Sequence, residues 1–71
     1  MAANDPSSPR ERQSSEVILF QRVGGGWEFR YTSEYETYTA FAYDAGLAKA
    51  RLMRQLGWDQ RRFFGADFRK F

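Results

Sequence analysis

The sequence predicts an α+β domain in which a three-stranded antiparallel sheet packs against one main helix. Three observations support this fold class. A β-prone segment is broken by consecutive glycines and followed by a strictly alternating segment, as in a hairpin. A helical stripe of apolar residues comes next. The chain has 71 residues, which limits it to one domain, expected over residues 16–71 after a disordered tail at residues 1–15.

The first two strands are expected at about residues 16–23 and 27–32. The segment EVILFQRV is rich in β-branched and aromatic residues, and the three glycines that follow it favour a turn. In the segment WEFRY, Trp27, Phe29 and Tyr31 alternate with charged residues and therefore share one face. We interpret this face as the core side of the sheet rather than as a platform for stacking nucleic-acid bases.

A third strand is expected at about residues 35–39 and the main helix at about residues 40–56. The junction between them has two interpretations. If the strand stops early, Thr39 is the N-cap; if it runs on, Asp44 caps a helix that begins at Ala45. We prefer the earlier start, because five apolar residues then share one helical face. These residues are Phe41, Ala45, Ala48, Leu52 and Leu56.

The end of the main helix and a short second helix are also predicted. Gly57 is expected to end the main helix in the left-handed conformation. A second helix is expected at about residues 59–70, with Asp59 as its N-cap. Three phenylalanines form one stripe of that helix and three basic residues lie opposite them: Phe64, Phe68 and Phe71, against Arg62, Arg69 and Lys70.

Charge is divided unevenly along the chain. Residues 1–45 hold four basic and seven acidic side chains, whereas residues 46–71 hold seven basic and two acidic ones. A fold that keeps these halves on different faces presents a basic surface, which attracts phosphate or acidic protein. The chain also has seven Phe, four Tyr and two Trp residues. At roughly 150–250 Å² each, most of them must be buried for so small a domain to fold.

The composition argues against several kinds of site. The chain contains no His and no Cys, so the usual proton shuttles, thiol nucleophiles and Cys-based metal sites are missing. Glu34 and Glu36 are interpreted as solvated carboxylates, and the glycine run lacks the Lys and the helix of a phosphate-binding loop. We expect no enzymatic activity, no cofactor and no metal. No apolar run is longer than Val17 to Phe20, so we expect a cytoplasmic protein without a membrane span.

Three strands followed by an amphipathic helix resemble, in layout, the sheet-plus-helix DNA-binding modules of some plant transcription factors and phage integrases. The Gly-Gly-Trp at residues 25–27 and the tract at residues 42–45 are similar to elements of the plant pattern. The first strand has only Arg22 where such modules place several base-reading side chains. The sequence therefore does not assign the chain to that family.

Two functions remain open. The first is a non-enzymatic regulatory protein that docks on an acidic or aromatic-accepting protein surface, or on a second copy of itself, through a basic and aromatic helical face. The alternative is a nucleic-acid-binding module that places the Arg and Lys side chains of residues 49–70 on phosphates. The candidate binding residues are the same in both cases: Arg51, Arg54, Trp58, Arg61, Arg62, Arg69 and Lys70.

Overall fold

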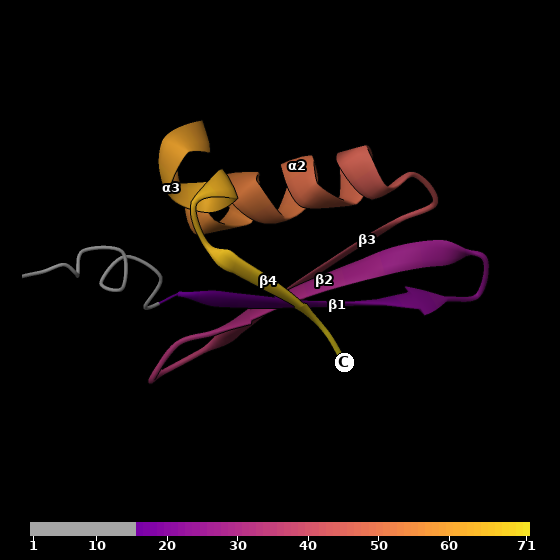
Figure 1. The fold of residues 1–71 in the computed structure, drawn as a ribbon, viewed down its shortest axis with the longest axis horizontal. Helices are drawn as coiled ribbons and strands as arrows, with labels where there is room; N and C mark the ends of the chain where they lie inside the picture. The colour runs from indigo at the N-terminus through magenta and orange to yellow at the C-terminus, as the bar shows by residue number, and fades with distance from the viewer. Residues whose placement is uncertain (1–15) are drawn as a thin grey trace, which may run out of the picture.

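The computed structural model describes residues 16–71, which form a sheet with helices on one side (Figure 1). The elements are β1 (Val17–Val23), β2 (Gly26–Thr32), β3 (Thr37–Ala42), α2 (Ala45–Leu56), α3 (Gln60–Phe64) and β4 (Asp67–Lys70). The strand order across the sheet is β3-β2-β1-β4. The α+β class is confirmed, whereas the prediction of three strands is wrong because β4 adds a fourth. The tail expected at residues 1–15 lies outside the described residues.

β1 and β2 form the predicted hairpin. The two strands pair antiparallel, with Phe20 opposite Phe29. Gly24 and Gly25 make the turn with φ angles of 52° and 83°, which glycine adopts without a steric penalty. Both strands and the turn are confirmed, because alternation and turn chemistry are properties of the local sequence.

β3 ends at Ala42 rather than at residue 39. Ala40 pairs with Phe29 of β2, Ala42 pairs with Trp27, and both alanines are buried. Pairing with β2 overrides the helix propensity of alanine. The preferred prediction, a helix from residue 40, is therefore wrong.

α2 begins at Ala45, as in the alternative interpretation. Asp44 has an extended backbone, and its carboxylate accepts a hydrogen bond from the Leu47 N–H at 2.9 Å. This is the geometry of an N-cap. At the other end Gly57 has a φ of 73°, and its N–H bonds to backbone carbonyls of the last helical turn. The predicted helix end is confirmed.

The predicted helix over residues 59–70 is wrong in its second half. Asp59 does cap α3, because its carboxylate accepts a hydrogen bond from the Arg62 N–H at 2.8 Å. The helix stops at Phe64, and the chain turns through Gly65 into β4. β4 pairs in parallel with the outer edge of β1, where the Asp67 N–H donates to the Glu16 carbonyl at 2.8 Å. Backbone groups of β1 that a three-stranded sheet leaves open are thereby satisfied.

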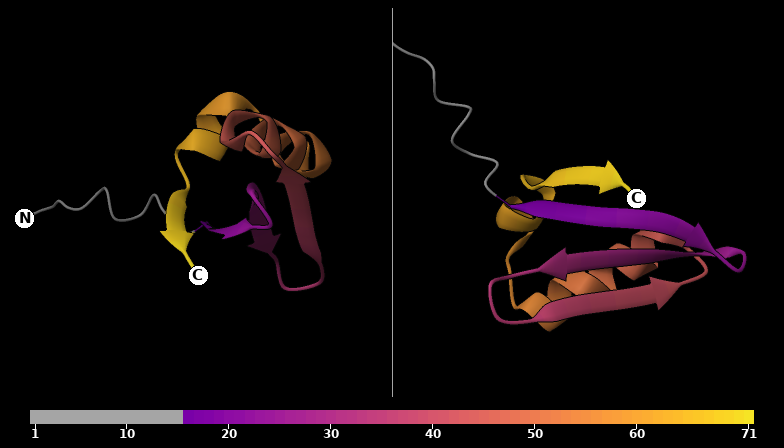
Figure 2. Two further views of the ribbon diagram at one scale, coloured as in Figure 1. Left: turned by 90° about the vertical axis from the view of Figure 1, so that its right-hand side faces the viewer. Right: turned by 90° about the horizontal axis from the view of Figure 1, so that it is seen from below.

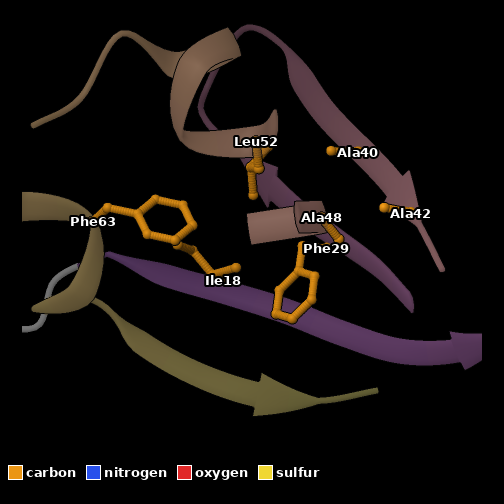
Figure 3. Close-up of a cluster of buried hydrophobic side chains, with 7 residues drawn as sticks. All are labelled: Ile18, Phe29, Ala40, Ala42, Ala48, Leu52 and Phe63. Atoms are coloured by element: carbon orange, nitrogen blue, oxygen red, sulfur yellow. The ribbon is translucent and has the colours of Figure 1, made fainter. Parts of the chain in front are cut away.

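Both helices lie on one face of the sheet, with the core between the two layers (Figure 2). Side chains from β1, β2, β3, α2 and α3 meet there (Figure 3). The buried residues are Ile18, Phe29, Ala40, Ala42, Ala48, Leu52 and Phe63. Trp27 and Tyr31 are partly buried against them. The prediction that Trp27, Phe29 and Tyr31 face the core is confirmed.

The other face of the sheet is not covered by a helix (Figures 1 and 2). Several of its side chains contact one another instead, although Nε of Arg30 is buried without a hydrogen-bond partner among residues 16–71. Glu28 accepts hydrogen bonds from Gln21 at 3.0 Å and from Arg30 at 3.2 Å, and the Arg30 guanidinium lies 4.7 Å from the centre of the Phe71 ring. The centre of the open face is therefore polar, whereas Val23, Phe41 and Phe71 leave apolar surface exposed around it.

Candidate functional site

Arg51 and Arg54 project from the exposed side of α2. Both are exposed, and the Arg51 guanidinium donates a hydrogen bond to the Phe41 carbonyl at 2.9 Å. That carbonyl belongs to β3, the edge strand of the sheet. The contact fixes the direction of Arg51 relative to the sheet. Within residues 16–71, neither arginine makes an ion pair with a carboxylate.

Apolar side chains lie beside these two arginines. Tyr43 is 74% exposed, Leu47 46% and Phe41 37%, and the rings of Phe41 and Tyr43 meet edge to face with centres 5.1 Å apart. We call the five residues the α2 surface. Its members are Phe41, Tyr43, Leu47, Arg51 and Arg54.

Two neighbouring hollows on the α2 surface share lining residues. One, of about 340 Å³, lies between residues 41–44 and the first turns of α2. The other, of about 170 Å³, lies along α2 and includes Arg54. Leu47 and Arg51 line both hollows. The surface is therefore continuous, apolar at its centre and basic along one side.

Phe41 takes its position from Gly26. A Cβ atom at Gly26 would lie 2.5 Å from Cζ of Phe41 and 2.8 Å from the Ala42 carbonyl. The absence of a side chain thus lets the Phe41 ring lie against the backbone of β2. An aromatic ring over a strand glycine supplies packing that the glycine lacks.

Trp58 is mainly a packing residue. Its ring meets Tyr31 edge to face at 4.9 Å and Phe63 at 6.4 Å between centres. The Arg62 guanidinium lies 4.1 Å from the centre of the Trp58 ring. Arg62 and Trp58 therefore contact each other at the rim of the core. None of these contacts involves a residue of the α2 surface.

Arg62 is also held by Glu16. Its Nε donates to both carboxylate oxygens at 3.1 Å, and its Nη2 donates to Oε2. Hydrogen bonding to this carboxylate raises the pKa of Arg62 above its ordinary value. The ion pair joins α3 to the residue before β1. The charge of Arg62 is therefore largely neutralised within the fold.

The remaining predicted cations divide between α3 and β4. Arg61 is exposed on α3. Arg69 donates from Nε to Asp67 at 2.8 Å, and Lys70 is the next residue along β4. Successive residues of a strand point to opposite faces, so Arg69 and Lys70 do not share a surface. The seven predicted residues thus form separate groups, of which Arg51 and Arg54 are the pair that lines the hollows beside Phe41, Tyr43 and Leu47.

Sequence reasoning missed Phe41 and Tyr43 as surface residues. The error follows from the helix boundary: on a helix from residue 40, Phe41 falls in the core stripe. The signal that could have placed it was the alternation of TYTAFA, in which the alanines face one side and Phe41 the other. Leu47 lies on the outer side of α2, where its side chain is 46% exposed.

The described residues offer little acid–base or metal chemistry. Across residues 16–71, no three acidic side chains gather as metal ligands would. The same part of the chain has no helix with the length and apolar character needed to cross a bilayer.

No family model matches the chain, and neither a curated protein nor a solved structure matches it.

Proposed function

We propose that this chain is a non-enzymatic interaction protein, which docks through the α2 surface on an acidic and partly apolar segment of a partner protein. The observation that carries the proposal is the juxtaposition of Phe41, Tyr43 and Leu47 with Arg51 and Arg54. Tyr, Phe and Arg are the residue types that dominate protein interfaces, whereas a charge-only surface would suit many anions equally.

Charge complementarity determines the kind of partner. Arg51 and Arg54 make no ion pair with a described carboxylate, and the nearby Asp44 is engaged in capping α2. A partner segment with Asp or Glu beside a bulky apolar residue would satisfy both parts of the surface. The contact of Arg51 with the Phe41 carbonyl supports this, because a side chain that is already oriented loses less entropy on binding.

Nucleic-acid binding by the Arg and Lys residues of positions 49–70 remains the second candidate for this region. It is less well supported, because Arg62 and Arg69 are paired with Glu16 and Asp67. Their phosphate contacts would have to compete with existing ion pairs.

Site-specific photocrosslinking tests the proposal. A photoreactive phenylalanine analogue replaces Tyr43 in one protein and Tyr35 in a second, and both are added to nuclease-treated extract of the source cells. Tyr35 is the matched control, since it is 88% exposed but lies in the turn between β2 and β3. We expect a protein adduct from position 43 alone, on a peptide with several acidic residues, and its loss in the Arg51→Glu/Arg54→Glu variant.

Three outcomes would contradict the proposal. They are equal crosslinking from both positions, a crosslinked peptide without acidic residues, and an adduct that survives the double charge reversal. Circular dichroism of the double variant serves as the control: loss of the adduct reports on binding where the spectrum matches that of the parent chain.

A further inference from the structure

A different hollow lies between α2 and the helix side of the sheet, beside β4. Its volume is about 280 Å³. Four of its six lining residues are aromatic: Phe20, Trp27, Phe29 and Phe68, together with Ala45 and Lys49. Phe20, Trp27 and Phe68 are only partly buried, because α2 packs mainly over β2 and β3 and leaves this part of the sheet less covered.

Lys49 is the one charged side chain among these six lining residues. Its ammonium lies 5.8 Å from the ring centre of Phe29 and 5.6 Å from that of Phe68. Within residues 16–71, no carboxylate pairs with it. An ammonium held over rings by cation–π attraction keeps its hydrogen-bond donors for an anion.

Two further cations lie next to residues that line the hollow. The Arg22 guanidinium lies 4.8 Å from the centre of the Trp27 ring. Lys70 is paired with Phe20 in the parallel register of β4 and β1, and so lies on the same face of the sheet. Glu28 and Asp67, the acidic residues within the described strands, occupy positions of the opposite face. Among the strand residues on the helix side of the sheet at this end, the charged side chains are the cations Arg22 and Lys70, and the nearby Asp44 is engaged in capping α2.

We infer that this hollow binds one unstacked base of a single-stranded nucleic acid, with Lys49, Arg22 and Lys70 on the neighbouring phosphates. The volume suits a single planar ring system rather than a drug-sized ligand. An anion-bearing amino-acid side chain would use one cation, whereas three cations around one aromatic hollow match successive phosphates along a strand. Aromatic walls with a basic border are the usual combination in proteins that bind single strands.

The duplex is disfavoured by the same geometry. A base in a duplex is stacked on both sides and cannot enter the hollow until it has been extruded. This site is separate from the α2 surface, and of the seven residues predicted from the sequence it uses only Lys70. Its success or failure is therefore independent of the proposed protein docking.

Fluorescence anisotropy with a labelled oligothymidylate of about 12 nucleotides tests the inference. We expect saturable binding that weakens with salt and quenches tryptophan emission. Lys49→Gln, Arg22→Gln and Lys70→Gln should each weaken binding about five-fold at 0.1 M salt, since each removes one phosphate contact. Arg54→Gln and Arg61→Gln are the matched controls, because they remove an exposed cation elsewhere, and we expect little change.

A second measurement does not depend on the variants. The affinity of the wild-type chain for the intact oligothymidylate is compared with its affinity for three other ligands. These are a strand of the same length that carries abasic sites, thymidine monophosphate and the corresponding duplex. We expect the abasic strand to bind about five-fold or more weakly, because the stacked base is missing, and the other two to bind more weakly than the intact strand.

The inference is overturned if the abasic strand or the duplex binds as well as the intact strand, if the mononucleotide binds as tightly, or if the control variants lose as much affinity as Lys49→Gln. It is also overturned if no binding occurs at low salt, or if polyglutamate binds as tightly as the oligonucleotide. Any of these results leaves the crosslinking test of the α2 surface unaffected.

Discussion

Adjacent phenylalanines in α3 have different roles. Phe63 is fully buried, whereas Phe64 is 56% exposed. The ring of Phe63 contacts Phe68 with 5.5 Å between centres and Trp58 with 6.4 Å. Phe63 thus holds the C-terminal segment to the core, while the neighbouring Phe64 side chain lies at the surface.

We expect Phe63→Ala to lower the free energy of unfolding by about 3–5 kcal/mol, the usual cost of deleting a buried ring. That is a large part of the total stability of a small domain. Urea denaturation followed by tryptophan fluorescence measures the change. Phe64→Ala is the matched control and should lie within about 0.5–1 kcal/mol of the parent chain. Equal effects of the two variants would contradict the assignment of Phe63 to the core.

The sequence alone could not distinguish these two residues. The expected stripe of Phe64, Phe68 and Phe71 assumes a continuous helix, but Gly65 ends α3 and the period changes from helix to strand. Phe71 is 44% exposed and Phe64 more so, so the stripe does not exist. Asp59 as the cap was predictable, because capping depends on residues close in sequence.

At the scale of elements, the junction of β3 and α2 decides where the α2 surface lies. Periodicity supported a helix from residue 40, and the competing cap at Asp44 was recognisable but not preferred. Residues 40–42 belong to β3 rather than to α2 because Ala40 and Ala42 pair with β2. Pairing is non-local, so single-segment propensity cannot evaluate it.

Asp44→Ala should lower the free energy of unfolding by about 0.5–2 kcal/mol, because the N–H of Leu47 loses its acceptor. Asp44→Ser should recover most of that loss, since a serine hydroxyl is also an N-cap acceptor. Thermal unfolding followed by circular dichroism at 222 nm provides the comparison. If alanine and serine prove equally stable, capping is not the reason that α2 begins where it does.

The helix also closes one edge of the sheet. Gln55 donates to the Thr39 carbonyl at 3.0 Å and Arg51 to the Phe41 carbonyl at 2.9 Å. Both carbonyls belong to β3, an edge strand. Side chains that occupy edge carbonyls oppose the pairing of that edge with another chain. Arg51 therefore has a structural role as well as its proposed part in docking.

At the scale of the whole molecule, the C-terminal segment completes both layers. Residues 58–71 supply α3 to the helical layer and β4 to the sheet, and they bring Phe63 into the core. The aromatic content of the chain predicted that most of its aromatic residues are buried, but it left open whether this segment packs or binds a partner. Its division into a short helix and a parallel strand was not predictable, because β4 forms only against the edge of β1.

We expect a chain truncated after Gly57 to lose its folded state. The truncation removes the fully buried Phe63 and the partner strand of β1. Two-dimensional NMR of the full and truncated chains measures this directly. Dispersed amide signals of β1, β2 and β3 should be lost on truncation. Retention of those signals would show that residues 16–57 fold without the C-terminal segment.

The parallel pairing of β4 with β1 also sets an order of assembly. β1 to β3 are joined by short turns, whereas Val17 and Asp67 are partners 50 positions apart. Closing so long a loop costs more chain entropy than closing a hairpin, and contacts of this range form late. We therefore expect the hairpins and α2 to associate transiently first, and β4 to dock afterwards and complete the stable fold. During that interval the outer edge of β1 is exposed to any other strand, which makes a partly folded chain the species most prone to associate.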